Sequence, residues 1–224
     1  MIRLLLFVIG YCCGLFETSY IVGRLNGIDI RKKGSGNAGA TNALRVLGNK
    51  AGFIVFFGDM LKCLIPCLIV RAVFSRVDPD HALLFMVITG FGVIVGHNFP
   101  IYLHFQGGKG ISATSALVFL THPVVCVAGV AGWFIPVIIT RYVSLGSLVA
   151  VAAYFFSNLF LLLAGELPVA AADAGEYMFW VTLISGLAYA RHGKNIKRLI
   201  HGTENKISFS KKKKTADADN RDQH

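Results

Sequence analysis

The most informative part of the sequence is a glycine-rich stretch whose residue types suit phosphate binding. Residues 34–45 read GSGNAGATNALR, and a helical pattern begins near residue 40. Glycine lets successive backbone N–H groups turn toward one anion, and a helix that starts there adds the positive end of its dipole. Arg45 adds a permanent charge. The stretch predicts a phosphate-binding loop, although taken alone it is equally compatible with a simple turn.

The same glycines also match a dinucleotide-binding fingerprint. Gly34, Gly36 and Gly39 satisfy G-x-G-x-x-G, and Asp59 follows twenty residues after the last of them. That fingerprint requires a buried strand before the loop and a βαβ unit around it. Here DIRKK precedes the loop, and Asp59 lies within an apolar run. The dinucleotide interpretation is therefore excluded.

A second candidate loop surrounds Lys109. Residues 105–110 read FQGGKG, so glycines flank the lysine, and an apolar run precedes and follows the loop. The loop is not a Walker motif, because Leu103 and Gly110 stand where glycine and Ser or Thr are required. A lysine in this setting can still reach an oxyanion as a mobile point charge.

A third polar stretch follows the last apolar run. Residues 191–206 read RHGKNIKRLIHGTENK. On a helix, Arg191, Asn195 and Arg198 would share one face with His192 beside it, and these donors suit phosphate or carboxylate. The lysines of the stretch are better explained as a charged anchor beside a membrane.

The elements that must position these loops are membrane helices. Of the 224 residues, 54% are hydrophobic and 15% are charged, and the mean hydropathy is +0.61. Such a composition is typical of a membrane protein. Apolar runs long enough to span a bilayer occupy 4–22, 51–70, 82–99, 124–140 and 143–164, and shorter ones occupy 111–120 and 177–190.

The distribution of basic residues favours seven spans over five or six. If the N-terminus lies outside, eighteen of the 22 Lys and Arg residues fall on the cytoplasmic side. Only Arg3, Arg71 and Arg76 fall outside, and Lys62 lies within a span. We therefore expect an all-α integral membrane protein with seven transmembrane helices, the C-terminus in the cytoplasm and all three polar loops on that face. Residues 1–206 form one membrane domain, and the basic tail 207–224 is predicted to be disordered.

Other classes of function find no support. The five cysteines lie in apolar runs without a C-x-x-C pair, and no histidine has zinc spacing, so the sequence predicts no metal site. The net charge of +10 is concentrated beside the predicted spans, where it suits anionic lipid or phosphate rather than nucleic acid. No cofactor is predicted.

Taken together, the motifs resemble a known family. GSGNAGATNALRVLG, GDMLKCLIP, GHNFPIYLHFQGGKG, RYVSLGS and RHGKNIKRLIHGTENK occur in this order, as in the bacterial acyl-phosphate:glycerol-3-phosphate acyltransferases of the PlsY type. The resemblance implies a seven-helix protein of the bacterial inner membrane with its site on the cytoplasmic side. It also implies transfer of an acyl chain from acyl phosphate to the sn-1 hydroxyl of glycerol 3-phosphate. The products would be lysophosphatidic acid and phosphate.

The resemblance also implies the site residues. Five are expected to bind the substrates and serve catalysis: Ser35, Arg45, Lys109, His192 and Asn195. The loops around them supply further expected substrate contacts: Gly34, Gly36, Asn37, Gly39, Thr41, Asn42, Gly107, Gly108, Gly110 and Arg198. The expected partners are acyl phosphate, glycerol 3-phosphate and membrane lipid. An adjacent His–acid pair is missing, which agrees with the family's substrate-assisted removal of the hydroxyl proton.

The sequence departs from the family in two places. Leu15 and Glu17 stand where the family has Ser and Pro, and GISAT replaces Gly-Val-Ala-Thr after Lys109, which leaves the start of the fourth helix open. Asp59 and Lys62 are three residues apart within a span, so we expect them to pair on one helix face. Either a structural ion pair or support for the phosphate loops would explain them.

Two alternatives remain. His97 is either a satisfied interface histidine or a residue that shapes the lysine loop. The rival function is a membrane phosphate or organophosphate carrier. A carrier normally shows internal repeats and helices broken at mid-membrane, and the sequence has no paired repeat.

Overall fold

The computed structural model describes residues 1–207, and the predicted tail beyond Ile207 lies outside the described residues. Within 1–207 the fold is entirely helical, as expected. The α-helices are α1 (Ile2–Gly14), α2 (Thr18–Leu25), α3 (Ala40–Leu47), α4 (Asn49–Val77), α5 (Ala82–Asn98), α6 (Ile111–Thr121), α7 (Pro123–Thr140), α8 (Val143–Leu163), α9 (Ala174–Arg191) and α10 (Gly193–Ile200). Short 3₁₀ helices are η1 (Ile30–Lys32), η2 (Pro79–His81), η3 (Ile101–Leu103) and η4 (Ala171–Asp173).

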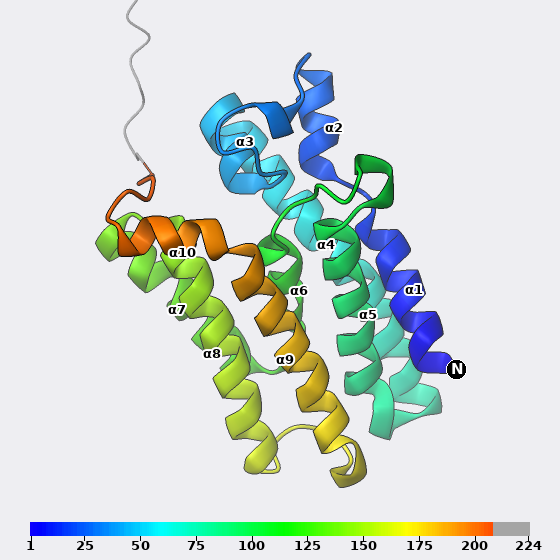
Figure 1. Ribbon diagram of the computed structural model, residues 1–224. Helices are drawn as coiled ribbons and strands as arrows, with labels where there is room; N and C mark the ends of the chain where they lie inside the picture. The colour runs from blue at the N-terminus through cyan, green and yellow to red at the C-terminus, as the bar shows by residue number, and fades with distance from the viewer. Residues whose placement is uncertain (208–224) are drawn as a thin grey trace, which may run out of the picture.

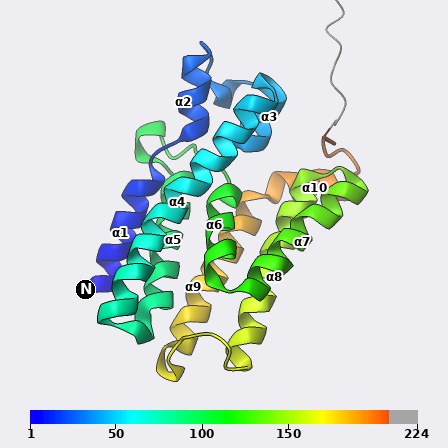
Figure 2. The same ribbon diagram turned by 180° about the vertical axis from the view of Figure 1, so that it is seen from behind.

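The long helices run between two ends of the molecule. In Figure 1, α1, α4 and α5 form one side, α7, α8 and α9 form the other, and α6 lies between them. Figure 2 shows the same arrangement from behind. Successive long helices alternate in direction, so the segments that precede α3 and α6 and the turn between α9 and α10 meet at one end. The short helices α2, α3 and α10 cover this end, and the N-terminus lies toward the other.

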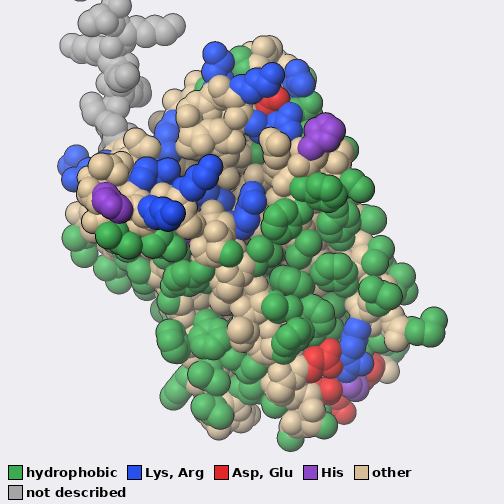
Figure 3. Space-filling view, in the orientation of Figure 1, with side chains coloured by type: hydrophobic (Ala, Val, Ile, Leu, Met, Phe, Trp, Pro, Cys, Tyr) green, Lys and Arg blue, Asp and Glu red, His purple; other side chains and the backbone are tan. Residues whose placement is uncertain are grey.

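The outer surface of the bundle is suited to lipid. Large apolar side chains such as Phe57, Ile139 and Phe160 are exposed along the long helices, and the apolar surface forms a band below the basic end in Figure 3. A water-soluble domain rarely exposes apolar area on this scale. Among residues 1–207, five helical segments are long and apolar enough to cross a membrane: Ile2–Leu25, Asn49–Val77, Pro79–Leu103, Pro123–Thr140 and Val143–Leu163.

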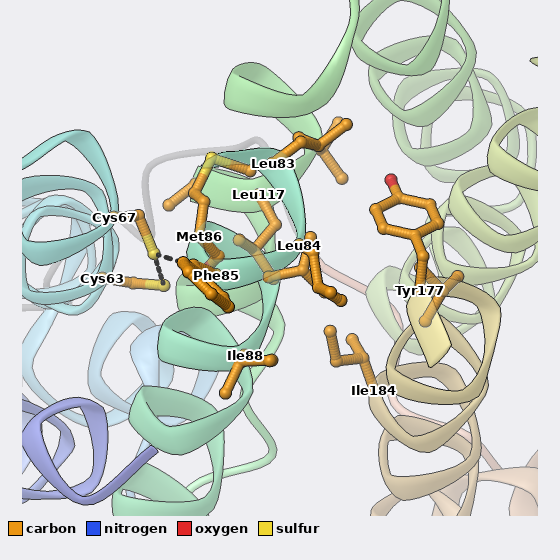
Figure 4. Packing of buried hydrophobic residues seen from close by; sticks show 14 of the residues in the cluster. Cys63, Cys67, Leu83, Leu84, Phe85, Met86, Ile88, Leu117, Tyr177 and Ile184 are labelled. Atoms are coloured by element: carbon orange, nitrogen blue, oxygen red, sulfur yellow. Dashed lines mark hydrogen bonds between the residues drawn. The ribbon is translucent and has the colours of Figure 1, made fainter. Parts of the chain in front are cut away.

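Helix α5 forms the centre of the protein. Its side chains are buried on nearly every face, because α1, α4, α6 and α9 all pack around it. Figure 4 shows Leu84 and Ile88 of α5 between residues of α4 and those of α9. The other labelled members of this core are Cys63, Cys67, Leu83, Phe85, Met86, Leu117, Tyr177 and Ile184.

Glycines bring α1 and α5 into backbone contact. Gly10 and Gly14 on α1 face Gly92 and Gly96 on α5, and each helix carries them four residues apart. A Cβ atom at Gly92 would collide with the carbonyl oxygen of Phe7. Small residues at this spacing let two helices approach closely, which strengthens van der Waals contact where lipid supplies no hydrophobic driving force.

The predicted first span, 4–22, is wrong in one respect, because the helix breaks between α1 and α2. The break frees backbone carbonyls, which must find partners inside a membrane protein. The Tyr102 hydroxyl donates to the Leu15 carbonyl at 2.9 Å, and Lys62 Nζ donates to the Phe16 carbonyl at 2.7 Å. Since these partners are far away in the sequence, the apolar run itself gives no sign of the break.

The close contact between α1 and α5 can be tested with two alanine substitutions. Gly92→Ala should destabilise the protein by about 1–3 kcal/mol, because the added methyl group overpacks a backbone contact. Gly186→Ala on α9 is the matched control, since a Cβ there meets nothing within 4 Å. It should be neutral or stabilising by up to about 1 kcal/mol through helix propensity. Thermal unfolding in detergent measures both, and equal effects would contradict the contact.

Candidate active site

A cavity of about 520 Å³ opens at the end of the bundle covered by α3 and α10. It collects residues from all three polar stretches predicted from the sequence. The predicted site residues that line it are Ser35, Gly36, Asn37, Gly39, Thr41, Asn42, Arg45, Gly107, Lys109, Gly110, His192, Asn195 and Arg198. Gly34 and Gly108 do not line it but belong to the same loops. Figure 3 shows basic side chains gathered over this end.

Asn42 shapes the first glycine loop. Its Oδ1 accepts a hydrogen bond from the Ser35 amide at 2.8 Å, and its Nδ2 donates to the carbonyls of Ile30 and Lys33 at 3.1 and 3.0 Å. Gly34 has φ of +60°, in the left-handed region that favours glycine. The Asn42 side chain therefore holds the loop in shape, and its role as a substrate contact stays a prediction.

The start of α3 supplies the positive end of a helix to the cavity. Gly39 is its N-cap and provides no capping side chain, while Ala40 and Thr41 line the cavity. Backbone N–H groups at such a terminus are natural anion ligands. Arg45 lies one turn further along and also lines the cavity, where its guanidinium donates to the Asn205 carbonyl at 3.4 Å.

In the lysine loop, both the amides and the carbonyls of its two adjacent glycines are hydrogen-bonded. The amides of Gly107 and Gly108 donate to the carbonyls of Asn98 and His97 at 3.3 and 3.1 Å. From the other side, the Arg191 guanidinium donates to the Gly107 and Gly108 carbonyls at 3.2 and 2.9 Å. Arg191, which the sequence offered as a phosphate donor, thus binds the backbone of the lysine loop.

A chain of polar contacts links Lys109 to the third stretch. Lys109 Nζ donates to Asn195 Oδ1, and Asn195 Nδ2 donates to Glu204 Oε1 at 3.0 Å. Arg198 Nε donates to Glu204 Oε2 at 2.7 Å. Glu204 is buried and was missed by the sequence reasoning. Its only signal was that it is the single acidic residue of a strongly basic stretch.

The third stretch is not one helix, so the predicted shared face of Arg191, Asn195 and Arg198 is wrong. Helix α9 ends at Arg191, His192 lies at the junction, and α10 begins at Gly193. The chain turns there, and α10 lies across the end of the bundle (Figure 1). This turn brings Asn195 and Arg198 over the cavity, which Arg191 also lines while it binds the lysine loop.

His192 is held as a neutral hydrogen-bond acceptor. Its Nδ1 lies 2.7 Å from the Ala188 carbonyl, so Nδ1 carries the proton and Nε2 keeps a lone pair. Burial, reinforced by the charge of Lys109, lowers the pKa of His192 to about 4. At neutral pH the imidazole is therefore uncharged, and it is a weak base.

The cations of the cavity are partly withdrawn from water. Burial lowers the pKa of Lys109 to about 8, and the neighbouring Arg198 and Arg45 act in the same direction against the opposing effect of Glu204. Burial likewise lowers the pKa of Arg45. Positive charges outnumber the two carboxylates that line the cavity, Asp59 and Glu204, so an anion would stabilise this site.

Other lining residues carried weaker sequence signals. Ser144 and Ser147, from the RYVSLGS motif, line the cavity, and the buried Ser144 hydroxyl has no hydrogen-bond partner among residues 1–207. Phe56 of α4 and Trp133 of α7 add apolar surface. The cavity therefore combines an anion-binding part with a part suited to hydrocarbon.

Comparisons with known proteins decide the family. Residues 4–202 match the family model described as glycerol-3-phosphate acyltransferase. The chain belongs to this family. Curated acyltransferases of that name are similar along their whole length. The one from Alkaliphilus metalliredigens is 39% identical over 208 residues, covering 92% of this chain and 97% of the relative. The one from Aquifex aeolicus is 38% identical, covering 92% and 100%.

Two solved structures share the fold. One is the crystal structure of PlsY (YgiH), an integral membrane glycerol 3-phosphate acyltransferase, in its glycerol 3-phosphate form. It has a TM-score of 0.77 and 34% identity, and the match covers 92% of this chain and 96% of that chain. The lysophosphatidic acid form has a TM-score of 0.75 and 33% identity, with 92% and 95% covered. The expected acyltransferase family and integral membrane character are thereby confirmed.

The lowered pKa of Lys109 predicts how anion binding by this acyltransferase depends on pH. Sulfate is a useful probe because it stays divalent from pH 7 to pH 9. Since Lys109 loses its proton as the pH passes about 8, sulfate affinity should fall by about tenfold over this range. Lys109→Arg keeps its charge, so its affinity should hardly change with pH. Titration calorimetry measures both, and an equal pH dependence in the two proteins would contradict the assignment.

Proposed function

We propose that this protein transfers an acyl chain from an acyl phosphate to the sn-1 hydroxyl of glycerol 3-phosphate. The hydroxyl oxygen attacks the acyl carbonyl carbon, a new ester C–O bond forms, and the C–O bond to phosphate breaks. The electron pair leaves with the phosphate, which also takes up the hydroxyl proton. The products are lysophosphatidic acid and inorganic phosphate.

The observation that carries the proposal is the meeting of Arg45, Lys109 and the α3 N-terminus in one cavity. Each substrate brings a phosphate, and this cluster offers two cationic side chains and backbone N–H groups to hold them. Ser35 and Asn195 line the same cavity and can hydrogen-bond the remaining oxygens. We assign glycerol 3-phosphate and the phosphate of the donor to this cluster.

His192 orients the attacking hydroxyl in this proposal. With the proton on Nδ1, its Nε2 accepts a hydrogen bond from the hydroxyl and points an oxygen lone pair toward the acyl carbon. A histidine whose pKa is about 4 is too weak a base to carry the proton away at neutral pH. The departing phosphate is the stronger acceptor, and this supports a substrate-assisted route.

The donor follows from the nature of the leaving group. An acyl phosphate is a mixed anhydride whose leaving group is stabilised by the same cations that bind it, so positioning and charge neutralisation suffice. Phe56 and Trp133 provide apolar surface for the acyl chain. A CoA thioester would need an additional site for its nucleotide and pantetheine arm.

A comparison of two donors tests this part of the proposal. Purified protein with glycerol 3-phosphate should release inorganic phosphate from an acyl phosphate and should use acyl-CoA of the same chain length poorly or not at all. Initial rates in the same detergent provide the comparison, and product mass confirms esterification. Equal or faster rates with acyl-CoA would refute the choice of donor.

For the membrane arrangement, we infer seven spans, adding α6 and α9 to the five long apolar segments. The N-terminus is outside and the cavity faces the cytoplasm of a bacterial inner membrane. The basic residues of α3, α10 and the loops at the cavity end support this orientation. A carrier would be expected to hold its substrate near the middle of the membrane, whereas this cavity lies at one end of the bundle.

Single-cysteine labelling tests the orientation. Asn49, Gln106 and Asn205 are exposed at the cavity end, so cysteines at these positions should react with a membrane-impermeant maleimide only when the cytoplasmic face is open. Inverted vesicles should be labelled and intact spheroplasts should not. The unmodified protein controls for the native cysteines. Labelling of Gln106→Cys from the outside would overturn the orientation.

A further inference from the structure

Four ionisable side chains lie buried together beneath the lysine loop. Glu17, Asp59 and His97 are each at most 2% exposed, and Lys62 is 9% exposed. They come from three places in the sequence: the break between α1 and α2, the middle of α4, and the end of α5. The proposed reaction has no direct use for them, yet burying so many charges in a membrane bundle is costly.

Lys62 is the hub of this cluster. Its ammonium group lies 3.0 Å from Asp59 Oδ1, 2.8 Å from His97 Nδ1 and 3.6 Å from Glu17 Oε1. It also donates to the Phe16 carbonyl at the helix break, at 2.7 Å. The expected pairing of Asp59 and Lys62 is thereby confirmed, but the pair is part of a larger network.

His97 is the member that touches the catalytic loop. On one side of the ring, His97 Nδ1 accepts from the Lys62 ammonium group at 2.8 Å, and Glu17 Oε1 lies 2.9 Å from the same nitrogen. The other side faces the lysine loop, because a Cβ at Gly108 would collide with His97 Nε2. The His97 carbonyl accepts the Gly108 amide at 3.1 Å. The position of this histidine therefore determines where the Gly107–Gly108 turn lies. Because Lys109 is the next residue in the sequence, its position depends on that turn.

We propose that the cluster of Glu17, Asp59, Lys62 and His97 positions Lys109 for phosphate binding, with His97 as the contact through which it acts. The inference rests on the proposed phosphate role of Lys109. Glu17 is the most informative member, because the family pattern has proline at its position and this chain has added a carboxylate. Asp59 and His97 line the cavity wall, but none of the four has a role at the reacting atoms in the proposed reaction, so these are positioning residues.

Glu17→Leu is the principal test, with Glu17→Gln as its matched control. Leucine removes the carboxylate that lies beside Lys62 and His97 Nδ1 but leaves Lys62 paired with Asp59, whereas glutamine keeps a polar group of the same size at this position. Glu17→Leu should raise the KM for glycerol 3-phosphate by about tenfold, because a displacement of about 1 Å is enough for effects of that size or larger. The change in kcat should be smaller, and Glu17→Gln should stay close to the wild type.

Hydrogen exchange provides a readout that simple loss of stability would not mimic. Peptides covering residues 105–110 should exchange faster in Glu17→Leu, because the amides of Gly107 and Gly108 lose a fixed partner. Peptides from α7 and α8, which are remote from the cluster, should not change. An unchanged KM together with unchanged exchange at 105–110 would overturn the proposal.

The route through Lys109 is tested by combining substitutions. In a Lys109→Ala background, Glu17→Leu should cause no further rise in KM, since the group it positions is absent. An equally large rise in that background would overturn the proposed route. If Lys109→Ala itself binds glycerol 3-phosphate normally, the phosphate role of Lys109 fails and the inference fails with it. If Lys109→Ala binds glycerol 3-phosphate poorly but Glu17→Leu has a normal KM, the phosphate role of Lys109 stands and only the positioning inference is refuted.

A second variant guards against a folding defect in Glu17→Leu. The double substitution Glu17→Gln/Lys62→Met removes one negative and one positive charge, so the net charge of the cluster is unchanged. The Phe16 carbonyl and His97 both lose the ammonium donor. This variant should show the same rise in KM and the same local exchange, and wild-type values for both would overturn the proposal.

Discussion

The structure depends on one constraint, which is that charges and free backbone groups inside a membrane bundle must be given partners within the protein. Lys62 meets this constraint at the break between α1 and α2, where it donates to the Phe16 carbonyl and forms an ion pair with Asp59. Because the break is satisfied, α2 can leave the direction of α1 (Figure 2) and carry the glycine loop over the end of the bundle.

In the cavity, in contrast, the charges are not fully paired, because cationic groups outnumber anionic ones. Glu204 accepts hydrogen bonds from Arg198 and Asn195, and it lies near enough to Lys109 to oppose the lowering of the lysine pKa. The cations of the cavity outnumber its two carboxylates, Glu204 and Asp59, and burial is the main cause of the lowered pKa of Lys109. Arg191 adds to this imbalance, because its charge also lowers the pKa of Lys109 while its guanidinium donates to the carbonyls of the lysine loop.

Sequence reasoning predicted the long helices, the loops and the start of α3 well, because apolar run length and glycine spacing are local properties. The same runs could not reveal the break at Leu15 and Phe16, whose carbonyls are satisfied by side chains 87 and 46 residues away. The turn at His192 was missed for a related reason, since RHGKNIKRL has an acceptable helical pattern. Glu204 was overlooked because charge counting treated its surroundings only as a basic anchor.

Of the two unpredicted breaks, the turn at His192 lines the cavity, whereas the break between α1 and α2 contacts Lys62 in the cluster beneath the lysine loop. The bilayer explains both positions. Irregular backbone is tolerated at the depth of a membrane only where it is buried in protein or lines a cavity. A site that must bind a phosphate needs free N–H groups and turns, which regular spanning helices do not offer. An acyl chain, in contrast, packs favourably against apolar side chains such as Phe56 and Trp133. The end of a helical bundle meets both demands, and there the turn at His192, the cations and the apolar wall occur together.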